Sequence, residues 1–169
     1  VRCVVAWAAP ADTRRAPVDL EEVLRGKGYY PFVNARTGQT MPVSRLAFED
    51  TVAILRGTGG KVGGVLHCFA YGPVEAEAFV ELGYHISFSG LVTFPKAPEI
   101  LAAARTVPLG RLLLETDGPY LAPVPHRGKR CEPAHVAVTG TFLAEKRGIS
   151  PEEIAAATTA NALALFGRK

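Results

Sequence analysis

The chain has 169 residues, 48% of them hydrophobic, which suits one well-buried domain of ordinary composition. Its formal net charge of +3 permits a polyanionic partner but does not demand one. It contains no run of 18 or more apolar residues, and residues 1–10 lack a signal-peptide layout, so we expect a soluble cytoplasmic protein with no membrane partner.

Residues 1–45 show no long periodicity, and only one short helix is expected there, over residues 19–25. From about residue 46, helical and strand patterns alternate with short glycine or proline breaks, which is the layout of βα units around a parallel sheet. We expect strands at 62–69, 84–89 and 111–116, and helices at about 46–57, 73–82, 98–105, 133–147 and 151–166. The fold class is therefore α/β.

Two helix boundaries carry clear signals. Gly148 ends the helix over residues 133–147, and Ser150 followed by Pro151 opens the last helix as a capping signature. The inward face of the helix over residues 73–82 is expected to consist of Val74, Ala78, Phe79 and Leu82.

Asp117 follows an apolar strand that stops at Glu115, and Gly118 with Pro119 then prevents helix or strand from continuing. A carboxylate is thereby delivered to the carboxyl end of a strand, the edge at which parallel α/β proteins carry out chemistry. The alternative is a turn-forming aspartate before glycine, and turn chemistry alone leaves both interpretations open.

His67 closes the strand over residues 62–69, so it is expected at the same edge as Asp117. An imidazole nitrogen and a carboxylate oxygen suit Zn²⁺, Mn²⁺ or, with more oxygen ligands, Mg²⁺. A hydrogen-bonded structural histidine is the competing interpretation.

A basic loop over residues 125–130 follows Asp117 and contains His126, Arg127, Lys129 and Arg130. These side chains can donate charge-assisted hydrogen bonds to a phosphate diester. A solvated surface loop is the alternative, but a loop that leaves the carboxyl end of a strand lies over the site, which favours phosphate binding.

Several neighbouring residues are expected to support such a site. Glu115 is expected to hydrogen-bond a ligating imidazole, and Tyr120 either does the same or packs.

Cys68 points to the opposite face from His67 and should pack rather than ligate. The three cysteines, Cys3, Cys68 and Cys131, are widely spaced and odd in number, which favours reduced thiols. His85 is expected either to be an ordinary polar residue on one face of the sheet or to line the site.

The chain carries a series of motifs in the following order: His67-Cys68-Phe69, Ile86-Ser87-Phe88-Ser89-Gly90, the run from Leu113 to Leu121, the basic loop with Glu132-Pro133, and Thr158-Thr159-Ala160-Asn161 before Leu165-Phe166-Gly167. In this order they resemble the TatD family of metal-dependent deoxyribonucleases over about residues 46–167. We therefore divide the chain into a divergent segment, residues 1–45, and a TatD-like metal-hydrolase barrel region, residues 46–169.

The resemblance implies a (β/α)₈ TIM barrel and a divalent metal ion, Mg, Mn or Zn, that activates water to hydrolyse DNA phosphodiesters. By the same resemblance His67 is a metal ligand, and Asp117 is a catalytic carboxylate that binds metal and helps activate water. The basic loop would hold the backbone of the DNA substrate.

The family's other metal ligands, a His-x-His pair, a glutamate and a further histidine, have no counterparts here. The four histidines are His67, His85, His126 and His135, and Val43 stands where the family has histidine. An intact barrel needs about 250 residues. We therefore expect an incomplete barrel that retains the C-terminal half.

A half-barrel exposes sheet edges and apolar faces, so self-association or a covering partner is expected, unless the chain derives from a broken reading frame. Two protein ligands seldom hold a metal tightly. The alternative function is accordingly a catalytically inactive family remnant that at most binds phosphate or nucleic acid.

Overall fold

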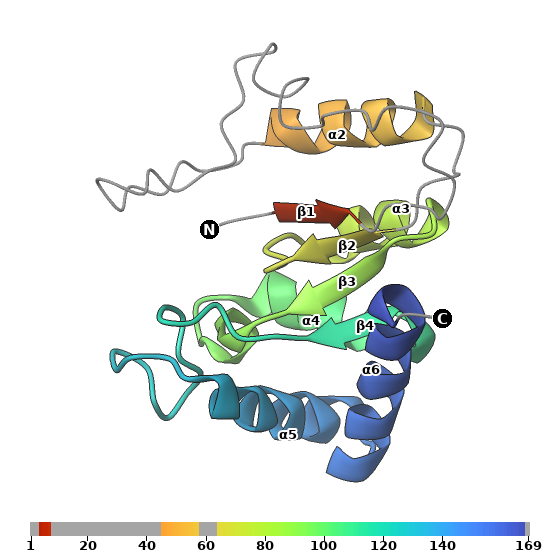
Figure 1. The fold of residues 1–169 in the computed structure, drawn as a ribbon. Helices are drawn as coiled ribbons and strands as arrows, with labels where there is room; N and C mark the ends of the chain where they lie inside the picture. The colour runs from red at the N-terminus through yellow and green to blue at the C-terminus, as the bar shows by residue number, and fades with distance from the viewer. Residues whose placement is uncertain (1–3, 8–44, 58–63, 168–169) are drawn as a thin grey trace.

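The computed structural model describes residues 4–7, 45–57 and 64–167 (Figure 1), so the helix expected over residues 19–25 lies outside the described residues. The strands and α-helices of these residues are β1 (Val4–Trp7), α2 (Arg45–Gly57), β2 (Gly64–His67), α3 (Pro73–Glu81), β3 (His85–Phe88), α4 (Pro98–Thr106), β4 (Leu112–Leu114), α5 (Val136–Arg147) and α6 (Pro151–Phe166). Three short 3₁₀ helices are η1 (Gly90–Thr93), η2 (Leu109–Arg111) and η3 (Pro133–His135). From residue 45 on, the helices and strands expected from the sequence are all present, with shifted ends.

The sheet has the strand order β1-β2-β3-β4, in which β2, β3 and β4 are parallel. Helices α3 and α4 connect these three strands and lie behind the sheet in Figure 1. Since parallel strands end at the same edge, the chain leaves β2, β3 and β4 on one side of the molecule. This is the βα arrangement that the alternating pattern predicts.

Strand β1 runs antiparallel to β2, with Val5 opposite Leu66. The sequence pattern did not predict this strand, because four residues are too few to show a period. Its backbone pairs with the edge of β2 that faces away from β3, so that β2 is not an edge strand of the described sheet.

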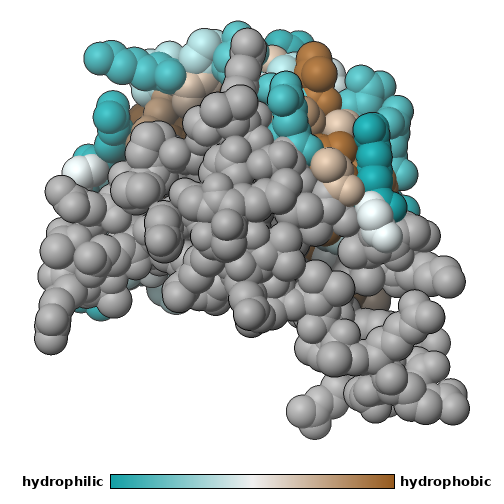
Figure 2. Space-filling model, turned by 90° about the horizontal axis from the view of Figure 1, so that it is seen from above, coloured by the Kyte–Doolittle hydropathy of each residue, from teal (hydrophilic) through white to brown (hydrophobic). Residues whose placement is uncertain are grey.

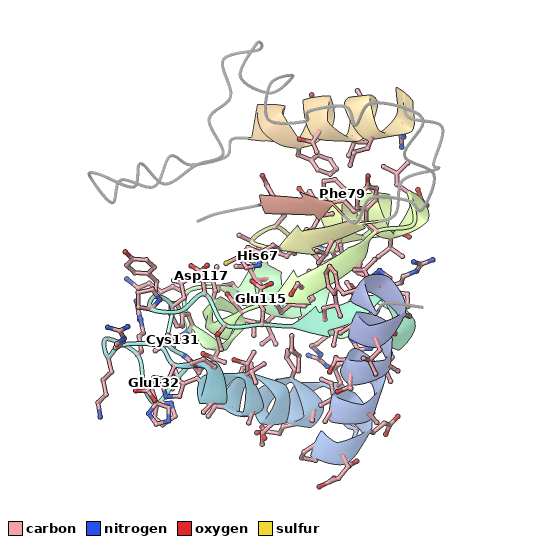
Figure 3. The ribbon with its side chains drawn as sticks, viewed as in Figure 1. His67, Phe79, Glu115, Asp117, Cys131 and Glu132 are labelled. Carbon is pink, nitrogen blue, oxygen red and sulfur yellow. The ribbon has the colours of Figure 1, made fainter. Side chains whose placement is uncertain are left out.

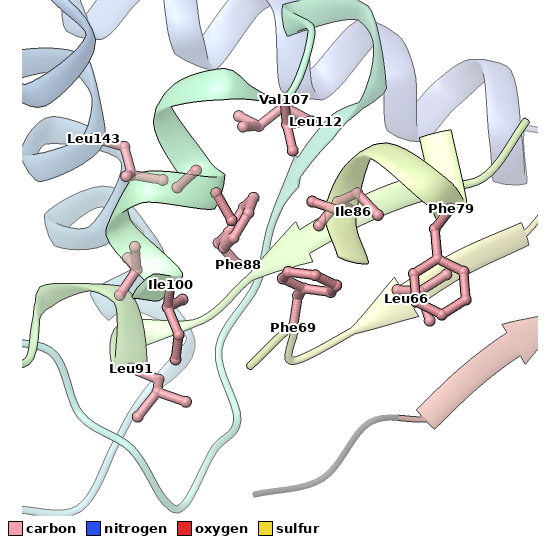
Figure 4. Close-up of a cluster of buried hydrophobic side chains, with 14 of the residues drawn as sticks. Leu66, Phe69, Phe79, Ile86, Phe88, Leu91, Ile100, Val107, Leu112 and Leu143 are labelled. Atoms are coloured by element: carbon pink, nitrogen blue, oxygen red, sulfur yellow. The ribbon is translucent and has the colours of Figure 1, made fainter. Parts of the chain in front are cut away.

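The core lies between the sheet and its helices (Figure 4). Leu66, Ile86 and Leu112 are neighbours across the three parallel strands and are completely buried. Phe79 of α3 and Leu143 of α5 belong to the same cluster. Seen from above in Figure 2, hydrophobic side chains gather between hydrophilic ones on the described surface.

The expected inward face of α3 is partly wrong. Val74 is 73% exposed, whereas Ala76 and Phe79 are buried. The helix contacts the core through this pair, which is spaced three residues apart on one face, while Val74 lies in its first turn. Phe79 is therefore placed correctly, and so are Ala78 and Leu82, which are partly buried and pack against the core.

Both boundary signals near the C-terminus are confirmed. Gly148 ends α5 with φ of +69°, a left-handed conformation that glycine adopts without strain. The Ser150 hydroxyl accepts a hydrogen bond from the Glu153 N–H at 3.0 Å, which caps α6. The described residues hold no helix of the length and apolarity that a membrane crossing requires.

Asn161 attaches α6 to the start of β4. Its side-chain amide donates to the carbonyl oxygens of Leu109 and Leu112, both at 2.8 Å. These bonds satisfy two backbone acceptors beside the strand that leads to Asp117, so α6 helps to hold that strand in place.

Candidate metal centre

Two strand ends bring His67 and Asp117 together at the carboxyl edge of the sheet (Figure 3). His67 is the last residue of β2, and Asp117 lies three residues after the end of β4. The Nε2 atom of His67 is 3.5 Å from Oδ1 of Asp117. Asp117 also accepts a backbone hydrogen bond from the Tyr120 N–H at 2.7 Å, so it both begins a turn and faces the imidazole.

Glu115 contacts the other nitrogen of the same imidazole. Its Oε2 atom lies 2.6 Å from Nδ1 of His67 and also accepts a hydrogen bond from the Ser87 hydroxyl. Its Oε1 atom accepts a hydrogen bond from the backbone N–H of Cys68 at 2.8 Å. One carboxylate thus ties together the ends of β2 and β4 and the middle strand between them, β3.

Ser87 was not assigned to the site from the sequence. The residue is buried within β3 between Ile86 and Phe88, and the alternating pattern of this strand does not distinguish it from a polar residue on an outer face. The feature of the sequence that could have indicated a role for Ser87 is a hydroxyl side chain in a strand, with apolar residues on both sides. Such a group needs a hydrogen-bond partner when it is buried, and Glu115 provides it.

Cys68 is buried, as expected for a residue that packs. Its Sγ atom is 3.3 Å from the Ser89 hydroxyl, and burial raises the pKa of the thiol to about 12. The residue has φ of +48°, an uncommon conformation for a residue with a side chain. This backbone turn directs the Cys68 N–H toward Glu115.

The two carboxylates keep His67 protonated in the metal-free protein. Hydrogen bonds to Asp117 and then to Glu115 raise the pKa of His67 to about 9, against the lowering effect of burial. The imidazolium proton on Nε2 therefore occupies the space that faces Asp117, where a cation would bind in its place.

The geometry of His67 and Asp117 fits two ligands of one ion. Ligand atoms bound to zinc at about 2.0–2.2 Å in a tetrahedron lie about 3.4 Å apart, close to the observed 3.5 Å. Glu115 on Nδ1 leaves Nε2 as the ligating nitrogen, an arrangement common for metal-bound histidine. Within the described ranges no group of three or more His, Cys, Asp or Glu side chains could hold a metal, so His67 and Asp117 would form at most part of a coordination shell.

The four side chains of the basic loop differ in their surroundings. His126 is half-buried and stacks on His135, with ring centroids 4.5 Å apart. The guanidinium of Arg127 lies over the Phe94 ring at 4.6 Å. Lys129 and Arg130 are exposed. The loop therefore presents cations at the surface, and its predicted contact with phosphate stays a prediction.

Two alternatives were open for each of two other residues. Tyr120 is 56% exposed, and both of its expected roles, a bond to the imidazole or packing, stay predictions. His85 begins β3 and lies at the opposite edge from His67, so it does not line the site. Its Nδ1 atom is buried without a hydrogen-bond partner, and burial lowers the pKa of this histidine.

The described fold is a TIM-barrel-type α/β arrangement with a candidate metal site at the carboxyl edge of its parallel strands. The family model described as TatD related DNase matches residues 43–167. The chain therefore belongs to the TatD-related DNase family, as the motifs indicated.

The curated relatives include proteins called metal-dependent hydrolases. YcfH of Escherichia coli K12, an uncharacterized metal-dependent hydrolase, is 52% identical over 126 residues, which cover 73% of this chain and 47% of YcfH. The uncharacterized metal-dependent hydrolase TatD of Mycobacterium tuberculosis is 40% identical over 133 residues, 78% of this chain and 50% of that protein. The chain thus spans about half the length of these relatives.

Solved structures agree with this assignment. YjjV, a TatD homologue from Escherichia coli K12, matches with a TM-score of 0.67 and 32% identity, over 75% of this chain and 49% of YjjV. A TatD family hydrolase from Entamoeba histolytica matches with a TM-score of 0.65 over 74% of this chain and 50% of that chain. At 20% identity the second structure supports the fold alone.

Proposed function

We propose that this chain forms part of a metal-dependent hydrolase that cleaves DNA phosphodiesters, with His67 and Asp117 as ligands of a divalent metal ion. The observation that carries the proposal is the His67 imidazole held between Glu115 and Asp117, with Nε2 directed at a carboxylate oxygen 3.5 Å away. The family description, TatD related DNase, supports DNA as the substrate.

A divalent metal bound there would supply a water of lowered pKa and offset charge that develops on the phosphoryl oxygens. Residues of the chain already orient the two proposed ligands. Glu115 fixes the imidazole orientation and holds the proton on Nδ1, so that Nε2 carries the free lone pair once its own proton leaves. Asp117 contributes an anionic oxygen from a turn that is closed by its own backbone carbonyl.

Arg127, Lys129 and Arg130 are the residues proposed to hold the phosphate backbone, with His126 beside them. Three of these cations lie within four residues on the surface of one loop, which supports a contact that depends on charge rather than on base sequence. We place the protein in the cytoplasm, a location supported by the free thiols of Cys68 and Cys131.

The test is hydrolysis of single-stranded and duplex DNA with Mg²⁺, Mn²⁺ or Zn²⁺ added to the purified chain. Metal-stimulated cleavage should be lost in Asp117→Asn and kept in Glu77→Gln, which removes an exposed carboxylate on α3. Equal activity in the Asp117 variant would show that a contaminating nuclease produced the signal and would contradict the proposal.

An inactive family member that binds nucleic acid is the second candidate. This candidate is favoured because the described residues offer only two candidate ligands at the site, whereas a tightly bound metal usually has three or four. DNA binding that needs no metal, without cleavage under any metal condition, is the result that would support this alternative over the hydrolase.

A further inference from the structure

Arg127 differs from Lys129 and Arg130, the other cations of the basic loop. Within the part of the chain that the structure describes, it is the one whose head group has a contact, since its guanidinium lies over the Phe94 ring at 4.6 Å. We propose that Arg127 makes the main contact between this loop and a phosphate of the DNA backbone, and that Phe94 is the residue that positions it. This inference rests on the proposed function and adds a residue from another segment of the fold.

A turn fixes the backbone of Arg127. The Lys129 N–H donates to the His126 carbonyl at 3.0 Å, which places Arg127 and Gly128 at the two central positions of a four-residue turn. Gly128 has φ of +87°, as the second central position of a type II turn requires, and glycine adopts this conformation without strain. The His126 N–H donates in turn to the Pro123 carbonyl at 2.7 Å. The arginine side chain therefore begins at a defined point of the loop.

The Phe94 ring is fixed by contacts that do not involve the basic loop. Its N–H donates to the Leu91 carbonyl at 3.0 Å, and its carbonyl accepts a hydrogen bond from the Ala97 N–H at 2.9 Å. The partly buried ring packs against the hydrophobic core. The position of the ring is thus set by the fold.

Residues just before Phe94 hold the chain that leads into the basic loop. The Leu121 carbonyl approaches Gly90 so closely that a Cβ atom on Gly90 would clash with its oxygen. The Thr93 hydroxyl accepts a hydrogen bond from the Val124 N–H at 2.9 Å and donates to the Gly90 carbonyl at 2.7 Å. The contact of the guanidinium with the ring continues this series along the two segments.

This arrangement favours phosphate binding by Arg127. A guanidinium over an aromatic face is attracted by the ring, and its N–H groups lie in its own plane, where they can donate to two phosphate oxygens. The side chain of Arg127 is exposed, so a ligand can reach these donors.

The freedom of the side chains distinguishes the three cations. Lys129 and Arg130 are exposed, and binding must immobilise their long side chains, which costs free energy. Arg127 is already held by the ring, so less of this cost remains when a phosphate binds. Arg127 should therefore contribute more to DNA affinity than either neighbour, although all three carry the same charge.

The experiment measures binding of a fluorescein-labelled ten-nucleotide oligothymidylate by anisotropy, in EDTA to prevent cleavage. Arg127→Gln should weaken binding roughly 10- to 100-fold, because it removes a charged donor that is already positioned. Arg130→Gln is the matched control, since it removes the same charge from the same loop, and it should weaken binding less than about fivefold.

Phe94→Leu tests the positioning role, because it removes the aromatic face and no charge. It should weaken binding roughly 2- to 5-fold in the unaltered chain and in Arg130→Gln, and it should have no further effect in Arg127→Gln. Phe94→Tyr keeps an aromatic ring and should bind as the unaltered chain does. A probe with the same bases on an uncharged methylphosphonate backbone should bind weakly and equally to all of these variants.

Equal losses in Arg127→Gln and Arg130→Gln, or a loss in Phe94→Leu that persists without Arg127, would overturn the inference and leave the hydrolase proposal intact. The two arginine variants change no core residue, so their comparison decides the question even if Phe94→Leu fails to fold. If the unaltered chain does not bind oligothymidylate, the DNA contact in the proposed function fails, and this inference fails with it.

Discussion

Glu115 and His67 are joined by a 2.6 Å contact between Oε2 and Nδ1 that spans from the end of β4 to the end of β2. The strand between them, β3, contributes the Ser87 hydroxyl to the same oxygen. The imidazole that faces Asp117 is thus oriented by the sheet itself, before any metal binds.

Glu115→Gln should reduce metal affinity about 10- to 100-fold, as loss of such a supporting carboxylate typically does. The amide keeps the size of the side chain but removes the charge that pairs with the imidazole. Titration calorimetry with Zn²⁺ or Mn²⁺ measures the change, and Glu77→Gln serves as the control. An unchanged affinity would mean that Glu115 does not act through His67.

The metal-free protein should lose stability as the pH rises from about 6.5 through about 9. The pKa of His67 is raised to about 9 in the folded protein from 6.5, so its contribution is complete below about 6.5 and disappears as the folded protein loses this proton. The loss should be about 1–3 kcal/mol, because the side chain is 29% exposed and screening reduces the effect. Urea unfolding at several pH values measures it.

His67→Gln should remove this pH dependence, while all other titrating groups stay in place. Parallel curves of unfolding free energy against pH for the two proteins would show that the raised pKa of His67 does not contribute to stability.

Neutralising Arg127, Lys129 and Arg130 to glutamine should make the salt dependence of DNA binding less steep. For single strands the slope of log K against log salt concentration falls by about 0.7 for each phosphate contact that is lost. Anisotropy titrations of labelled oligonucleotide between low and moderate salt measure this slope.

A matched triple variant removes the same charge elsewhere. Arg56, Arg105 and Lys146 each lie in the last turn of a helix, away from the basic loop in sequence. Changing these three to glutamine should leave the slope as it is in the unaltered chain. Equal slopes for both triple variants would indicate a general charge effect rather than a phosphate site in the loop.

Asn161→Ala should destabilise the protein by about 1–3 kcal/mol, because it leaves the carbonyls of Leu109 and Leu112 without this partner. Urea unfolding measures the loss. Thr159→Ala, on the exposed side of the same helix, should change stability by less than about 0.5 kcal/mol. Equal stabilities of the two variants would contradict an anchoring role for Asn161.

The sequence was informative where a residue's position along a strand decides its position in space. His67 ends an apolar strand and Asp117 follows another, and the ends of parallel strands meet at one edge, so their proximity could be predicted without coordinates. Glu115 could be placed for the same reason. The motifs around these residues also identified the family that the comparisons show.

Other features depend on contacts between distant segments and leave no local pattern. Ser87 resembles an ordinary polar strand residue until Glu115 is seen beside it, and Asn161 resembles an ordinary helical one. The left-handed backbone of Cys68 has no signal in its residue type. Val74 was misplaced because helical periodicity does not show which of two neighbouring faces meets the core.

A double-mutant cycle on metal binding tests most directly whether His67 and Asp117 hold one ion. His67→Ala and Asp117→Asn should each weaken Zn²⁺ or Mn²⁺ binding at least about tenfold, and the double variant should be little worse than either single one, because both residues hold one ion. Single variants that bind metal as tightly as the unaltered chain, or losses that simply add, would contradict a shared metal site.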